Sequence, residues 1–146
     1  MSERFEKRLA HSGLGVEVRR FPAGTRTAED AARAIGCEVG QIVKSLVFTL
    51  EGEPVVLLVS GANRVEPGRF EGRLAKADAD LARAATGYSI GGVPPFGHES
   101  PVRVFMDRDL ERYDTVWAAA GRPDSVFPIS PADLRRLSGA EVRDLK

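Results

Sequence analysis

Lys44 is the first residue that could do chemistry, because it stands in an apolar row. If residues 42–50 form a strand, Lys44 shares one face with Ile42 and Leu46. A lysine on such a face must bring its ammonium to water, to an anion or into a cavity. Two interpretations stay open. Lys44 reaches solvent from the end of the strand, or it lines a pocket and meets a phosphate or a developing oxyanion.

The second chemical feature is a loop rich in glycine and proline, GGVPPFG, at residues 91–97. Glycine lets a backbone approach a ligand closely, and proline fixes the course of the loop. Several backbone N–H groups could then point at one spot, which is the geometry that stabilises an oxyanion. The same composition also suits an ordinary tight connection, and it contains neither a Walker nor a dinucleotide-binding motif.

The remaining polar residues offer fewer possibilities. His98 follows the loop and is a general base, a ligand contact or a structural hydrogen-bond donor. The sequence has neither the G-x-S-x-G nor the H-E-x-x-H motif of common hydrolases, and Cys37 is interpreted as a small apolar residue. The acidic stretch from Asp107 to Asp114 is interpreted as a solvated face, and Trp117 as a core residue rather than a stacking platform.

Local patterns predict the elements that would position these residues. Residues 42–60 read as two apolar strands around the turn EGEP, which predicts a β-hairpin. Helices are predicted over residues 2–12, from an N-cap at Thr27 to Gly36, and after Ser130-Pro131. The other predictions are an edge strand around Val16 and Val18, a helix from Pro67 through Leu74, a helix capped by Asp78 or Asp80, and strands over 102–106, 115–121 and 125–130.

This mixture of hairpins and alternating elements predicts a mixed α/β fold with substantial antiparallel pairing. A length of 146 residues fits a single domain, 1–146. The 21 basic and 21 acidic residues cancel, so tight non-specific nucleic-acid binding, and DNA as a partner, are not expected. A brief contact with an RNA end remains compatible with this balance. The start of the chain does not resemble a signal peptide and no apolar run is long enough for a membrane span, so we expect a cytoplasmic protein without a membrane partner.

Three stretches together resemble one family: IVKSLVF at 42–48, TGYSIGGVPPFG at 86–97 and AAGRPDSVFPISPADLRRL at 119–137. In order and spacing they are similar to the YbaK family of editing domains associated with proline-tRNA synthetase, over nearly the whole chain. The resemblance implies a compact single-domain α/β fold whose mixed, mostly antiparallel, partly barrel-like sheet is flanked by helices. It implies an aminoacyl-tRNA deacylase that hydrolyses the ester between a wrong amino acid and the 3′ end of tRNA, with no metal and no cofactor.

The resemblance also implies roles for individual residues. Lys44 matches the family lysine that contacts the substrate near its phosphate or ester. Three glycines match loop positions whose backbone amides hold the aminoacyl carbonyl, and with Lys44 they form the expected catalytic set: Gly91, Gly92 and Gly97. Substrate contacts are expected from Ser45, Pro94, His98 and Gly121.

The expected substrate is tRNA for proline carrying a small amino acid such as alanine, cysteine, serine or threonine. Two departures leave the amino acid open: the loop reads VPPF where the family usually has I-S-P-L, and Ala119 stands where serine is frequent. Since no protein base is evident, the attacking water is activated either by the substrate itself or by a base that the sequence does not reveal.

The expected partners are the 3′ end of aminoacylated tRNA and, with it, prolyl-tRNA synthetase or an elongation factor. Two other functions remain as alternatives. One is a non-catalytic module of the same fold that binds a tRNA end or a synthetase. The other is a hydrolase of small esters or amides, which is disfavoured because no protein nucleophile is evident.

Overall fold

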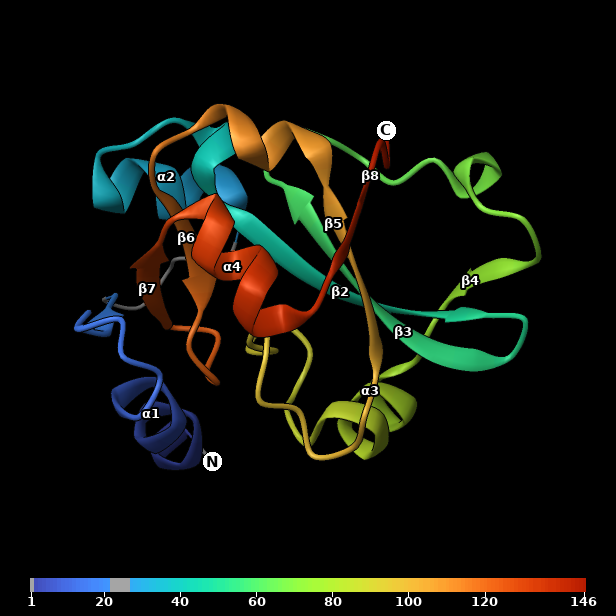
Figure 1. The fold of residues 1–146 in the computed structure, drawn as a ribbon, viewed down its shortest axis with the longest axis horizontal. Helices are drawn as coiled ribbons and strands as arrows, with labels where there is room; N and C mark the ends of the chain where they lie inside the picture. The colour runs from blue at the N-terminus through green and yellow to red at the C-terminus, as the bar shows by residue number, and fades with distance from the viewer. Residues whose placement is uncertain (1, 22–26) are drawn as a thin grey trace.

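The computed structural model describes residues 2–21 and 27–146, and within these ranges the strands form two sheets flanked by helices (Figure 1). The larger sheet has the strand order β4-β2-β3-β5-β8, and the smaller has the order β1-β7-β6. In this part of the chain, no helix has the length and apolar character needed to cross a membrane.

The predicted hairpin forms the middle of the larger sheet. Strands β2 (Val43–Leu50) and β3 (Glu53–Ser60) are antiparallel, and they are joined by a turn in which Glu51 and Gly52 both have positive φ. The outer strands are β4 (Leu74–Lys76), antiparallel to the end of β2, then β5 (Arg103–Asp107), parallel to β3, and β8 (Glu141–Arg143), parallel to β5.

The smaller sheet packs on the first one across a shared hydrophobic core and is joined to it by one isolated β-bridge. Strands β6 (Val116–Ala119) and β7 (Ser125–Ile129) are antiparallel, and β1 (Arg19–Arg20) pairs with β7. An isolated parallel bridge joins Ile42, just before β2, to Trp117 of β6. The mixed α/β class is therefore confirmed, while the described strands stay in two sheets that meet without closing into a barrel.

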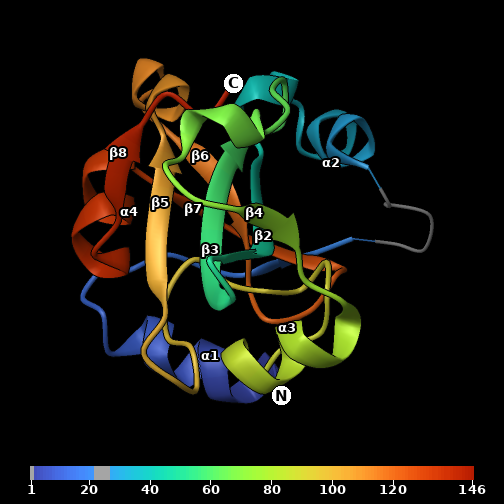
Figure 2. The ribbon, with the colours of Figure 1, turned by 90° about the vertical axis from the view of Figure 1, so that its right-hand side faces the viewer.

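The described helices begin where the local signals predicted, and the first of them ends at residue 10 instead of the expected residue 12. They are α1 (Ser2–Ala10), α2 (Ala28–Ile35), α3 (Ala79–Thr86) and α4 (Pro131–Ser138). Thr27 and Asp30 form a capping box at α2, and Asp78 and Ser130 accept backbone N–H groups at the starts of α3 and α4. Figure 2 shows α2 at one end of the sheets and α1 and α3 at the other.

Two sequence predictions are wrong, and two short strands, β4 and β8, were not predicted. The expected helix from Pro67 through Leu74 is only the short 3₁₀ turn Pro67–Arg69, because Phe70 turns inward onto Phe105 and Gly72 takes φ 101°. The expected strand around Val16 and Val18 is irregular, since these valines pack on the core beside the two paired residues of β1.

Strand β3 is buried on both faces, which explains its continuous apolar sequence. Val56 and Leu58 belong to the core between the two sheets, together with Phe5 of α1 and Leu134 of α4. The alternate residues of β3 face the opposite side, where a second cluster contains Val55, Leu57, Val59, Phe70, Phe105 and Leu145. Since β3 packs against a hydrophobic cluster on each face and pairs with β2 along its whole length, β2 has a well-defined position from which its residues can line a site.

Candidate active site

A cavity of about 530 Å³ lies beside the first part of β2. Strand β2 pairs with β4 only through Phe48, Thr49 and Leu50, so the preceding part of its outer edge is left for the cavity. The other walls come from the start of α2, the loop at residues 90–93, β6, the start of β7 and the end of β4. Most of this lining is apolar, and its charged members among the described residues are Lys44 and Lys76.

Lys44 lines this cavity and is half-buried. Its ammonium donates a hydrogen bond to the backbone oxygen of Asn63 at 2.6 Å. Burial lowers the pKa of Lys44; Glu29 opposes this effect, Arg64 adds to it, and Asp107 opposes it. An ammonium has three N–H donors, so two remain for a ligand as far as the described residues are concerned. This position fits the pocket-lining interpretation of Lys44, and its role in a reaction stays a prediction.

Ser45 also lines the cavity, and its hydroxyl is a buried group without a hydrogen-bond partner among the described residues. A buried polar group left in this state costs about 1–3 kcal/mol. A ligand atom in the cavity that donates or accepts a hydrogen bond would remove this cost. Ser45 is therefore a cavity-lining residue with an unpartnered hydroxyl, and its contact with substrate stays a prediction.

The first part of the glycine loop forms one cavity wall. Gly91 lines the cavity with φ 90°, and its N–H makes no hydrogen bond to the rest of the described chain. The N–H of Gly92 is already used, because it donates to the oxygen of Ser89 at 3.0 Å. Gly121 is buried in the turn between β6 and β7 and is not part of the lining. Of these three glycines, only Gly91 both lines the cavity and has an N–H without a hydrogen-bond partner in the described chain.

The second part of the loop lies outside the lining. The oxygen of Pro94 is 2.7 Å from Nε2 of His98, and since a carbonyl only accepts, Nε2 carries the proton. Burial lowers the pKa of His98. The oxygen of Gly97 accepts a hydrogen bond from the guanidinium of Arg8. The structure thus brings Lys44, Ser45 and Gly91 together and places Pro94, Gly97 and His98 elsewhere.

Comparison with known sequences identifies the class of protein that carries this cavity. The aminoacyl-tRNA editing domain family matches residues 22–137. The chain belongs to this family.

Relatives of this editing domain occur both as small proteins and as parts of synthetases. The uncharacterised protein YwhH of Bacillus subtilis is 33% identical over 133 residues, which cover 86% of this chain and 83% of YwhH. A proline–tRNA ligase of Nitratidesulfovibrio vulgaris is 32% identical over 93 residues, 60% of this chain but only 16% of the ligase.

Solved structures agree with the fold of this editing domain. A crystal structure described as a candidate trans-editing enzyme for prolyl tRNA synthetase has a TM-score of 0.93 and 46% identity, over 99% of this chain and 96% of its own. A hypothetical protein of known structure has a TM-score of 0.87 and 26% identity over 97% of this chain. The predicted resemblance is confirmed.

The aromatic lining of the cavity was not predicted for this editing domain. Trp117 packs against the buried cluster of Ala31, Ala32 and Ile42, as expected of a core residue, but it is only half-buried and also lines the cavity. The guanidinium of Arg19 lies 5.3 Å from the centre of its ring. Ile90 lies in the same lining with 56% of its surface exposed. Only the pairing of β6 with residue 42 places Trp117 here, and no local pattern signals such a pairing.

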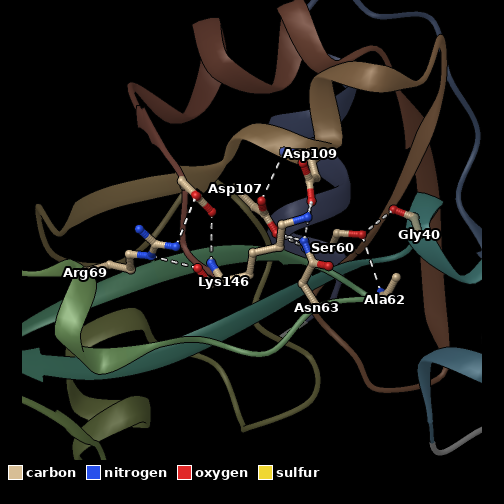
Figure 3. A network of polar contacts seen from close by, with 9 residues as sticks. Gly40, Ser60, Ala62, Asn63, Arg69, Asp107, Asp109 and Lys146 are labelled. Carbon is tan, nitrogen blue, oxygen red and sulfur yellow. Dashed lines mark hydrogen bonds and ion pairs between the residues drawn. The ribbon is translucent and has the colours of Figure 1, made fainter.

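The interpretation of the acidic stretch as a solvated face is also wrong at its first residue. Asp107 is completely buried at the end of β5, and its carboxylate accepts from the N–H of Ser60 and the amide of Asn63 (Figure 3). Glu111 follows the predicted pattern, since it pairs with Arg135 in the exposed part of the stretch.

Proposed function

We propose that this editing domain is an aminoacyl-tRNA deacylase that acts in trans on mischarged tRNA. The observation that carries the proposal is the cavity itself. In one apolar pocket it combines a lysine ammonium, an unpartnered buried hydroxyl and a free backbone amide. The structural likeness to a candidate trans-editing enzyme supports the same activity.

The proposed substrate is tRNA for proline that carries a small amino acid, namely alanine, cysteine, serine or threonine. Two features support this choice: the ligases among the relatives are proline–tRNA ligases, and the cavity wall contains the small side chains of Ala28, Ala31 and Ala119. The match covers only a small part of the ligase, so ligation itself is not proposed for this chain.

The proposed reaction is attack of a water oxygen on the ester carbonyl. A carbon–oxygen bond forms, negative charge develops on the carbonyl oxygen, and the bond to the tRNA ribose breaks as a proton passes to the ribose oxygen. The N–H of Gly91 and the charge of Lys44 would stabilise the oxyanion or the adjacent phosphate. The described lining contains no aspartate, glutamate, histidine or cysteine, which supports activation of the water by the substrate rather than by a protein base.

A deacylation panel tests this function. Transfer RNA for proline is charged separately with alanine, cysteine, serine, threonine and proline, and loss of each ester is followed with and without the protein. We expect rapid loss of one or two mischarged species while the proline ester is spared. Lys44→Ala should slow the reaction by about 10²-fold or more. Lys7→Ala, which removes an exposed lysine of α1, is the matched control and should change nothing.

Two outcomes would redirect the proposal. Binding of tRNA without turnover of any ester would favour the non-catalytic module. Hydrolysis of simple amino-acid esters without a preference for tRNA would favour the small-molecule hydrolase.

A further proposal concerns the partners. The balance of 21 basic and 21 acidic residues supports weak binding of tRNA by the domain alone, so prolyl-tRNA synthetase or an elongation factor would deliver the substrate in the cytoplasm. Binding of tRNA is measured with and without each partner. If the domain alone binds tRNA as tightly as it does with the synthetase or the elongation factor, this proposal is contradicted.

A further inference from the structure

The buried carboxylate of Asp107 organises the turn that follows β3. Its Oδ2 accepts from the N–H of Ser60 at 3.1 Å and from Nδ2 of Asn63 at 2.9 Å, and its Oδ1 accepts from the N–H of Asp109 at 3.0 Å. A buried charge is costly unless its oxygens are hydrogen-bonded in this way. Figure 3 shows these groups converging at the ends of β3 and β5.

Asn63 occupies the centre of this network. Its amide nitrogen also donates to Oδ2 of Asp109 at 2.8 Å, and Asp109 is paired on its outer side with Lys146 at 2.8 Å. An ionised carboxylate only accepts hydrogen bonds, so two carboxylates fix the orientation of the Asn63 amide. The N–H of Asn63 donates to the oxygen of Ser60 at 2.9 Å. Both the backbone and the side chain of Asn63 are therefore held.

The backbone oxygen of Asn63 accepts the hydrogen bond from Lys44 at 2.6 Å. A lysine side chain otherwise moves among many rotamers, at a cost of about 2 kcal/mol when it is ordered. Here the acceptor that orders Lys44 is the backbone oxygen of Asn63. The side chain of Asn63 is in turn held by the buried carboxylate of Asp107.

We propose that Asn63 and Asp107 are positioning residues that hold the Lys44 ammonium at the cavity. That Asn63 and Asp107 hold Lys44 in place follows from the geometry alone. That this matters for catalysis rests on the proposed function. The hydrogen bonds of Asp107 go to Ser60, Asn63 and Asp109, none of which lines the cavity, so Asp107 acts through Asn63.

Charge supports this arrangement. The charged groups that act on Lys44 are Glu29 from α2, Arg64 from the turn after β3 and Asp107 from the end of β5. Burial lowers the pKa of Lys44, and the negative charge of Asp107 counteracts that effect. Removing this charge should lower the pKa further, whereas removing only the Asn63 side chain leaves the charge in place.

The first experiment needs no activity. The chain has four lysines, at positions 7, 44, 76 and 146, so lysine labelled with ¹³C at Cε gives a small NMR spectrum that Lys44→Arg assigns. In Asn63→Ala we expect the Lys44 side chain to become as mobile as that of exposed Lys7. Its signal should then show the same motional averaging as the Lys7 signal. In Asp107→Asn we expect the pKa of Lys44 to fall below its wild-type value.

Glu111→Gln is the matched control, because it removes an exposed carboxylate from the same stretch, and it should leave the Lys44 signal unchanged. A Lys44 signal that is identical in wild type, Asn63→Ala and Asp107→Asn would overturn the proposal. If Asp107→Asn does not fold, Asn63→Ala decides by itself, since residue 63 lies in a half-buried turn.

The second experiment is a double-mutant cycle on deacylation under single-turnover conditions. Asn63→Ala should lower the rate about tenfold in the wild-type background, and by less than about twofold when Lys44→Ala is already present. Equal losses in both backgrounds would mean that Asn63 only supports the fold, and would overturn its positioning role. If the wild type cleaves no ester, the proposed function fails while the NMR result still decides how Lys44 is held.

Discussion

The two halves of the glycine loop differ in what they contact. The first half, at Gly91 and Gly92, lies against the cavity and the turn after β6. The second half, at Gly97 and His98, is fastened to the molecule by Arg8 and by the loop's own Pro94. One continuous motif therefore contains a part that faces the cavity and a part that anchors the loop, and the two should respond differently to substitution.

The largest expected effect is that of Gly92→Ala on the first half. A Cβ at this position would lie 2.9–3.1 Å from backbone atoms of Arg122, so the loop or the neighbouring turn must move. Since a displacement of about 1 Å at a catalytic site costs about 10²-fold in rate, we expect a loss of that size in single-turnover deacylation.

Gly52→Ala is the control for this experiment. Gly52 has φ 83° in the hairpin turn and open space around it, so the substitution strains the backbone far from the cavity. It should lower the melting temperature and leave the deacylation rate unchanged. Equal rate losses in the two variants would show that strain alone explains the effect at Gly92.

Ser45→Ala should have the next largest effect. If the substrate satisfies the buried hydroxyl, its removal should lower kcat/KM about tenfold, as expected for one lost hydrogen bond in a buried site. The melting temperature should stay equal or rise, because the free protein no longer buries an unpartnered group. An unchanged kcat/KM would remove Ser45 from the substrate site.

Arg8→Ala tests the anchoring half and should affect stability alone. The lost hydrogen bond to Gly97 should cost about 1 kcal/mol in the free energy of unfolding, measured by urea denaturation. The deacylation rate should not change. A large loss of rate without a loss of stability would place the second half of the loop in the catalytic site after all, as the family resemblance implied for Gly97.

The smallest expected effect is a pH dependence at His98. Burial lowers its pKa, so the folded protein binds this proton less readily than the unfolded chain. The stabilisation is present above about pH 6.5, the ordinary histidine value, and is lost as the pH falls through the lower folded value. His98→Gln should therefore flatten the decline of the melting temperature in that range. A decline identical to that of the wild type would exclude His98 as its source.

Local signals predicted much of this fold because the interactions behind them are local. Thr27, Asp78 and Ser130 cap their helices through N–H groups three residues ahead, and the hairpin is closed by its own turn. The burial of Asp107 could not be predicted in this way, since its partner Asn63 lies 44 residues earlier in the chain. A run of acidic residues has the same pattern whether or not a distant turn covers one of them.

The same limit applies to the site. The apolar row predicted that the Lys44 ammonium must reach water, an anion or a cavity, and the structure places it at a cavity; its part in a reaction stays a prediction. The glycines could not be separated by sequence, since their difference lies in hydrogen bonds: the Gly92 amide is used by Ser89, while the Gly91 amide is not used within the described chain. Composition indicates that amides can converge, but not which of them are free.

The parallel pairing of β3 with β5 sets an order on the assembly of the active site. The hairpin of β2 and β3 is local and can form early, whereas β5 must return to β3 across the whole segment that contains α3 and the glycine loop. Until this closure, Gly91 has no fixed place opposite Lys44, and Asp107 cannot reach Asn63. A chain with only the hairpin in place would therefore present Lys44 without the loop, so that the proposed editing site would be complete only once β5 has paired with β3.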